Sequence, residues 1–442
     1  MRVMKWSMIA LAVAAAASTQ LAVAAPFVSD QAEAKGFVED SKLDLLVRNY
    51  YYNRNKTDGA VDDKDWTQGI QGMYSSGYTQ GLIGVGVEAW GQLAIKLDGS
   101  DKYSGSGNMS VSDNDEVNNS QGKSGAAAKF RISKTELKVG DMQPSTSPVF
   151  AVGGSRILHQ TASGLQLQSS EVKDLDLEAG HFYSATSQDK NARDGSLWAT
   201  YAGVQANSID YFGGKYGVND NLSFSLYGAK LEDVWNQYYA NANYTLPLGG
   251  DQSLNFDGNY YNTKDTGNAK AGEISNNAYS LAAAFSFLKA HTLTLGFQKV
   301  NGDTPFDYIG VGKNNRGGDS IFLANSIQYS DFNAPGEKSV QARYDLKMAE
   351  YGVPGLSFMT RYVKGWDIDG TNTPAGSPYA GLYGADGKHH ETNVEVKYVV
   401  QSGPAKDLSF RIRQAWHSAN ADEGEGDISE FRLITDYPLN IL

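Results

Sequence analysis

Two arginines stand two residues apart in the segment LSFRIRQAWHS, residues 408–418. Phe410 and Ile412 alternate with Arg411 and Arg413, so an extended strand would place both arginines on one face and the apolar side chains on the other. The whole chain is acidic, with a formal net charge of −12. A row of fixed cations attracts carboxylates and exchanges them from site to site. The segment therefore predicts a wall of the protein that attracts and exchanges anionic groups.

Basic residues take the polar position of several other alternating segments. These residues are Arg131, Arg343, Arg361, Lys397 and Arg432. If the apolar positions face lipid, the charges must face a lumen, because an arginine in lipid costs about 2–4 kcal/mol near the bilayer midplane. The alternative is that the arginines only pair with lumenal acids such as Asp345, Glu395 and Asp436. The two interpretations do not exclude each other.

The elements that would carry these residues are strands with one apolar and one polar face. Clear examples are residues 222–227, 279–287, 292–298 and 340–347. Short turn sequences separate some strands, at 219–221, 249–251, 354–355 and 403–404, and long polar glycine-rich stretches separate others, at 99–125, 144–164 and 302–335. Tight turns at one end and long loops at the other predict an all-β, antiparallel transmembrane β-barrel.

Composition and the first residues support an exported membrane protein. Arg2 and Lys5 precede an apolar stretch and the small-residue triplet Ala22-Val23-Ala24, which predicts a signal peptide over residues 1–24 and a single barrel domain over 25–442. No later stretch could form a membrane-spanning helix, and the 26 tyrosines suit interfacial girdles. A large secreted soluble β-protein, a sandwich or β-helix, is the alternative fold.

Strand length sets the size of the barrel. At roughly 10 residues per membrane strand, 16–18 strands leave ample chain for loops and enclose a lumen wide enough for small solutes. The absence of cysteine excludes disulfides, thiolate metal sites and cysteine catalysis. The absence of a basic tract argues against a nucleic-acid partner.

Two predicted loops carry apolar residues that are unusual in solvated loops. The first, residues 302–337, combines Phe306 and Ile321 with acids and tyrosines, among them Asp303, Asp307, Tyr308, Asp319, Tyr329 and Asp331. The second, residues 143–164, combines Phe150 and Leu158 with Arg156. We expect both loops to fold into the lumen or over its mouth and to form a constriction.

Motifs for catalysis, cofactors and metals are weak. The QGKS at 121–124 lacks the preceding glycine of a phosphate loop, and no Gly-x-Ser-x-Gly frames a serine. His389-His390 has no third histidine nearby in sequence, so we interpret it as a solvated loop pair. We expect no cofactor and no metal.

Several segments together resemble the OprD family of porins, the substrate-specific carboxylate channels of Gram-negative outer membranes. The resemblance runs along the whole chain after the signal peptide. It is carried by FVSDQAEAKGFVEDSKLDLLVRNYYYNR, FRISKTELKVGDMQPSTSPVF, LDLEAGHF, PFDYIG, GGDSIFLANS and VVQSGPAKDLSFRIRQAWH. It implies an 18-stranded barrel with inward-folded loops in the outer membrane, and is nearest to the member that passes basic amino acids and the carbapenem imipenem.

The resemblance also implies roles for particular residues. An arginine ladder would include Arg411, Arg413 and Arg432, and a constriction would include Tyr201, Tyr308, Ser326, Tyr329 and Asp331. The implied solutes are arginine, lysine and small zwitterionic carboxylates. Members are further credited with a serine-peptidase activity, whose residues would be His181, Asp233 and Ser320. An outer-membrane barrel with peptidase activity is thus the alternative to a pure channel.

Overall fold

A computed structural model describes residues 26–442 apart from Asp58, Asp113 and Asp115, and the predicted signal peptide lies outside this range. Within it, 18 strands form one antiparallel sheet. The strands are β1 (Lys42–Lys56), β2 (Asp63–Ser75), β3 (Gly84–Asp98), β4 (Ser120–Ile132), β5 (Thr135–Met142), β6 (Thr161–Ser169), β7 (Leu175–Thr186), β10 (Ile209–Asn219), β11 (Leu222–Leu231), β12 (Trp235–Gly249), β13 (Gln252–Asp265), β14 (Ser275–Phe287), β15 (His291–Asn301), β18 (Lys338–Lys347), β19 (Leu356–Ile368), β20 (Gly387–Val399), β21 (Ser409–Ala419) and β22 (Ile428–Asn440).

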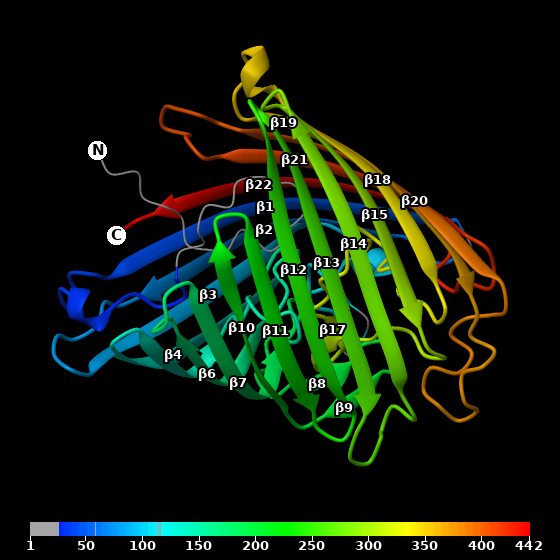
Figure 1. Cartoon of the computed structure of the whole chain (residues 1–442), viewed down its shortest axis with the longest axis horizontal. Helices are drawn as coiled ribbons and strands as arrows, with labels where there is room; N and C mark the ends of the chain where they lie inside the picture. The colour runs from blue at the N-terminus through cyan, green and yellow to red at the C-terminus, as the bar shows by residue number, and fades with distance from the viewer. Residues whose placement is uncertain (1–25, 58, 113, 115) are drawn as a thin grey trace.

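The sheet is closed, because its last strand pairs with its first. Strand β22 lies antiparallel to β1, with Arg432 opposite Tyr52. Figure 1 shows β22, in red, running beside β1, in blue. Closure pairs the backbone groups that an open edge would expose, which is the condition for crossing a bilayer with strands. The prediction of an antiparallel barrel of about 18 strands is confirmed.

Alternation along each strand divides lipid-facing from lumen-facing side chains. On β21, Phe410 and Ile412 are 44% and 42% exposed, whereas Arg413 is 8% exposed. Large exposed apolar residues of this kind recur around the barrel and include Phe212, Leu226, Leu281 and Leu295. Apolar surface on this scale needs lipid rather than water as its neighbour.

The two ends of the barrel differ. Short turns at residues 133–134, 220–221, 250–251 and 288–290 connect strands at one end, and Gly249 and Gly250 take positive φ at one of them. The connections at the other end include 99–119, 143–160, 187–208, 302–337 and 369–386. The first long loop ends earlier than expected, because Gly122 and Gly125 belong to β4.

Two of the long loops meet in a second, smaller sheet. Strands β8 (Ser196–Ala199) and β9 (Val204–Ala206) come from loop 187–208, and β16 (Ile309–Gly312) and β17 (Arg316–Gly317) come from loop 302–337. They pair in the order β17-β16-β8-β9. Phe150, Phe306 and Leu323 of the inward loops are buried in one apolar cluster with barrel residues, so these loops fill part of the lumen.

Among the residues that the structure describes, helix is confined to three short 3-10 segments, η2 (Gln31–Glu33), η3 (Asp101–Ser106) and η4 (Met348–Tyr351). In the described part of the chain, no helix is long and apolar enough to cross a membrane.

Candidate functional site

Arg411 and Arg413 face the lumen from β21 and share one carboxylate. Arg411 Nη2 lies 2.7 Å from Glu395 Oε2 on the neighbouring strand β20, and Arg413 Nε lies 3.2 Å from the same oxygen. The Arg413 contact is an ion pair without hydrogen-bond geometry, so the Nε of each arginine makes no hydrogen bond to a described residue. Two guanidinium groups against one carboxylate leave a net positive charge and unfilled donors at this point of the wall.

A second shared carboxylate continues the wall onto β22 and β1. Glu430 lies 2.5 Å from Arg432 Nε and 2.6 Å from Arg54 Nη2, and it accepts a hydrogen bond from the Tyr52 hydroxyl at 2.7 Å. Arg54 and Arg432 both lie 5.6 Å from the centre of the Tyr52 ring. Two cations therefore meet at Glu430, and Arg54 also lies 3.8 Å from a second carboxylate, Asp63.

Strand register joins these groups into one basic wall, which we define as Arg54, Arg343, Arg361, Arg411, Arg413 and Arg432. Arg413 stands opposite Arg432, and Arg343 stands opposite Arg361. Arg361 donates to the side-chain oxygen of Asn393 at 2.9 Å. Lys397 stands opposite Arg411 on β20.

Some arginines are fully paired, as the alternative interpretation expects. Arg343 binds Asp345 through Nε and Nη2, both at 2.7 Å. Arg48 binds Asp436 at 2.7 and 3.1 Å and also donates to two loop carbonyls. Pairing and an excess of positive charge therefore coexist on the same wall.

Arg131 lies apart from these shared carboxylates, whereas Arg156 lies near Glu430. Arg131 points inward from β4 but is covered by the N-terminal segment, where it donates to Gln31 and Ser29 and stacks on Tyr78 at 4.0 Å. Arg156, in loop 143–160, donates to the Ser106 carbonyl and lies 5.3 Å from the Tyr52 ring. Arg156 thus approaches the basic wall from the loop side.

Four of the predicted constriction residues meet around one carboxylate. Asp331 accepts hydrogen bonds from the Ser326 hydroxyl at 2.6 Å and from the Tyr201 hydroxyl at 2.9 Å. The rings of Tyr201 and Tyr308 pack edge to face, 6.1 Å apart. Burial raises the pKa of Asp331 above its ordinary value. These two hydrogen-bond partners are neutral hydroxyl groups, so they do not neutralise the negative charge of Asp331 when it is ionised.

Asp307 organises the backbone of the neighbouring loop. It is 3% exposed, and its two oxygens accept hydrogen bonds from the backbone N–H groups of Tyr201 and Ala202 and from the Tyr379 hydroxyl. Burial raises the pKa of Asp307 to about 6. The same cause raises the pKa of Asp319 to about 6.

Tyr329 belongs to the same loop but faces the basic wall. Its hydroxyl donates to the Glu425 carbonyl at 2.8 Å, and the Arg54 guanidinium lies 4.7 Å from its ring centre. The loop therefore presents Asp331 toward Tyr201 and Tyr329 toward the arginines.

The three residues of the implied peptidase occupy separate environments. His181, on the outward parity of β7, binds Asp210 of β10 at 2.7 Å. Asp233, in the connection after β11, accepts from Asn268 and lies 3.8 Å from Lys270. The Ser320 hydroxyl is buried in the inward loop, with no hydrogen-bond partner among the described residues. No contact among the described residues joins these three side chains into a triad.

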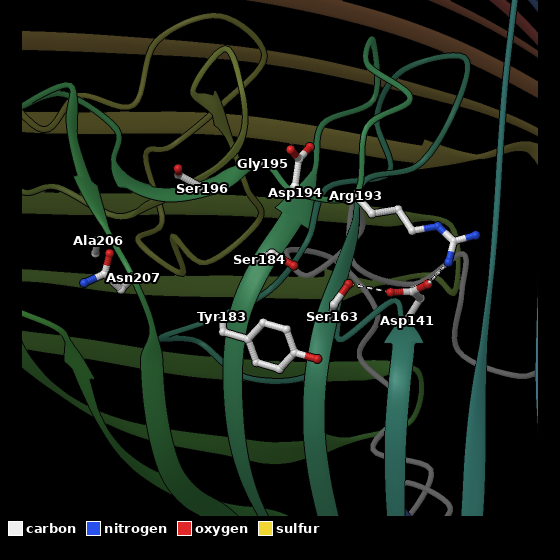
Figure 2. Close-up of a pocket in the computed structure, with 10 residues that line it drawn as sticks. All are labelled: Asp141, Ser163, Tyr183, Ser184, Arg193, Asp194, Gly195, Ser196, Ala206 and Asn207. Carbon is white, nitrogen blue, oxygen red and sulfur yellow. Dashed lines mark hydrogen bonds and ion pairs between the residues drawn. The ribbon is translucent and has the colours of Figure 1, made fainter.

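A pocket of about 580 Å³ lies away from the basic wall, beside Tyr183 and loop 187–208. Figure 2 shows Arg193 reaching Asp141 on one side while Ser163 binds that carboxylate on the other. The Arg193 to Asp141 distance is 2.9 Å. Tyr183 is 56% exposed on the outward side of β7, so the pocket belongs to the rim of the barrel.

Sequence reasoning missed some residues of the wall and misplaced others. Arg54 of the basic wall and Arg48 of the same strand share one parity with Tyr50 and Tyr52 in LVRNYYYNR, and this shared strand face was the signal that could have found them. Of loop 187–208, only Tyr201 was expected at the constriction, through the resemblance, and its strands β8 and β9 were not. The interpretation of His389 as part of a solvated loop pair is wrong, because His389 is 3% exposed on β20, whereas His390 on the opposite face is exposed.

A closed 18-stranded barrel with apolar residues outside, a basic wall inside and loops folded into the lumen defines an outer-membrane channel protein. A family model described as outer membrane porin, OprD family, matches residues 35–441. The chain belongs to this family, and the expected location in a Gram-negative outer membrane is confirmed.

Individual relatives agree over almost their full length. Porin D of Pseudomonas aeruginosa is 63% identical, with all of both chains covered. A crystal structure of Pseudomonas aeruginosa OprD matches with a TM-score of 0.84 and 61% identity, over 95% of this chain and 100% of that one. The Pseudomonas aeruginosa OpdK structure with vanillate matches with a TM-score of 0.81 and 32% identity, over 92% and 100% of the two chains.

Proposed function

We propose that this porin selects solutes that carry both a carboxylate and a cationic group, namely arginine, lysine and small zwitterions including carbapenems such as imipenem. The solute carboxylate is received by the basic wall, and its cationic group is received by Asp331 in the inward loop. Each contact replaces part of the solute's hydration, and shared, exchangeable partners keep the contacts weak enough for release.

The observation that carries this proposal is the unequal pairing on the wall. Glu395 contacts both Arg411 and Arg413, so a solute carboxylate can take the place of the anion that the second guanidinium lacks. The inward loop supplies a negative charge for the cationic group of the solute. This charge is on Asp331, whose hydrogen-bond partners are the neutral hydroxyls of Tyr201 and Ser326. The OpdK structure with vanillate, a carboxylate, supports this class of solute.

Liposome swelling tests the proposal. Vesicles that contain the purified protein should admit L-lysine and L-arginine faster than neutral solutes of equal size, and faster than diamines that lack the carboxylate. Equal rates for all these solutes would overturn the proposed selectivity while leaving the channel itself intact.

A further inference from the structure

Two histidines and two glutamates converge on the lumen side of the barrel near the long-loop end. His389 lies on β20, His417 lies on the adjacent β21, and Glu423 and Glu425 follow in the connection 420–427. One ligand atom from each of the four lies within 4.8 Å of all the others. The basic wall and the constriction use none of these four side chains.

The orientation of the His417 ring follows from its backbone contact. His417 Nδ1 lies 2.8 Å from the carbonyl oxygen of Gly426. A carbonyl oxygen only accepts, so Nδ1 carries the hydrogen. In the neutral ring, Nε2 then presents a lone pair, and it lies 2.8 Å from His389 Nδ1.

His389 is held in a matching way by a carboxylate. Its Nε2 lies 2.8 Å from Glu337 Oε1, and the other oxygen of Glu337 accepts from the Ala334 backbone N–H. When Nε2 donates to the Glu337 carboxylate, Nδ1 also presents a lone pair. Nδ1 of His389 and Nε2 of His417 lie within hydrogen-bond distance of each other, and a cation bound between them would take the lone pairs of both nitrogens. Outer hydrogen bonds to a carboxylate and a backbone carbonyl are the usual supports of metal-binding histidines.

The two glutamates add oxygen ligands at suitable distances. Glu423 Oε1 lies 3.5 Å from His389 Nδ1, and Glu425 Oε2 lies 3.7 Å from His417 Nε2. Glu425 Oε2 is buried, with no hydrogen-bond partner among the described residues. Ligand atoms around a tetrahedral Zn²⁺ are separated by roughly 3.4 Å, given bonds of about 2.0–2.2 Å. The two histidine nitrogens need to separate by only about 0.6 Å to reach this geometry.

We propose that His389, His417, Glu423 and Glu425 form a binding site for one Zn²⁺ ion, with Glu337 and the Gly426 carbonyl orienting the imidazole rings. Two imidazole nitrogens and two carboxylate oxygens are ligands that zinc accepts, and the ion balances the charge of the two carboxylates.

An ion bound at this site would fix loop 302–337 to the barrel wall. Phe332 stacks on the His389 ring at 4.1 Å, and Tyr329 packs on the His417 ring at 4.9 Å. Both aromatic residues flank Asp331 in loop 302–337, and Glu337 ends that loop. An ion that fixes both imidazole rings therefore stabilises the loop that carries the acidic pole of the pore.

The test uses the full chain in detergent, stripped with a chelator and titrated with zinc chloride. We expect one zinc per chain, a rise in unfolding temperature on zinc addition, and an X-ray absorption spectrum with two imidazole and two oxygen ligands. His417→Gln should weaken zinc binding by at least about 100-fold. The matched control is His390→Ala, which removes an exposed histidine beside His389 and should bind as the wild type does.

The proposal is overturned by wild-type protein that binds no stoichiometric zinc, or by His417→Gln protein that binds as tightly as wild type. If His417→Gln does not fold, Glu425→Gln and the wild-type absorption spectrum decide the question. A bound zinc whose spectrum lacks imidazole ligands rejects the site.

Discussion

The Arg432 guanidinium donates a hydrogen bond to the backbone carbonyl of Gln328, with a nitrogen-to-oxygen distance of 3.1 Å. This contact joins the basic wall on β22 to the inward loop 302–337. The Gln328 side chain completes the connection by donating to Glu430, also at 3.1 Å. Asp331 lies three residues further along the same loop. One loop segment therefore contacts the basic wall and also carries the acidic residue of the constriction.

Asp331→Asn should slow the entry of lysine without closing the channel. The amide oxygen can still accept from Tyr201 or Ser326, but the negative charge that receives a cationic group is gone. We expect lysine flux to fall about tenfold, which corresponds to about 1.4 kcal/mol of lost interaction, while neutral solutes pass unchanged. Liposome swelling measures both rates. Asp303→Asn, an exposed acid of the same loop, is the control, and an equal loss in that variant would reject a specific role for Asp331.

Asp307→Asn should weaken the contact between loop 302–337 and loop 187–208. An amide nitrogen in place of Oδ2 would face the Ala202 N–H and leave that donor unsatisfied, at a cost of about 1–3 kcal/mol. The expected result is a noisier open channel in planar bilayers, because the segment that carries Tyr201 loses its anchor. Current noise equal to that of the wild type would show that the loop does not depend on this carboxylate.

Acidification should reduce the preference for cationic solutes. Burial raises the pKa of Asp307 and of Asp319 to about 6, from the ordinary 3.8. Both carboxyl groups are therefore mostly ionised at pH 7 and mostly neutral at pH 5, and the negative charge near the constriction is lost as pH falls through about 6. Reversal potentials measured between pH 5 and pH 8 should show this midpoint, with a smaller change in Asp319→Asn. A midpoint near pH 4 would contradict the assignment.

Peptidase activity should not depend on Ser320. His181 binds Asp210 on the outward side of β7, while the Ser320 hydroxyl is buried in the inward loop without a hydrogen-bond partner among the described residues, so His181 is not placed to activate this serine. Purified wild-type protein and Ser320→Ala should hydrolyse a chromogenic peptide at the same background rate. A rate that disappears in Ser320→Ala would instead establish the enzyme.

Strand parity made the fold and much of the wall predictable. The alternation of Phe410 and Ile412 with Arg411 and Arg413 leaves only one tolerable orientation in a bilayer, and the structure has it. The inward loops were also recognisable, because Phe150 and Phe306 need apolar partners that a solvated loop does not offer.

Contacts between distant strands could not be read from the sequence. His389 and His417 meet because β20 and β21 pair in a register that places Glu391 opposite His417, and neither segment alone reveals this register. The buried position of Asp307 likewise depends on loop 187–208 folding onto loop 302–337. Which arginines retain excess charge depends on where Glu395 and Glu430 fall across the strands.

The central claim is that the unpaired positive charge of the basic wall receives the solute carboxylate, and single-channel recording with and without lysine tests it most directly. In the wild type, lysine should change the conductance at low concentration. In Arg411→Ala, Glu395 retains only Arg413. The lysine concentration that produces half of the conductance change should therefore rise about tenfold. Lys289→Ala removes an equal charge from a short turn and should leave the effect unchanged. An identical lysine response in the wild type and Arg411→Ala would contradict the account.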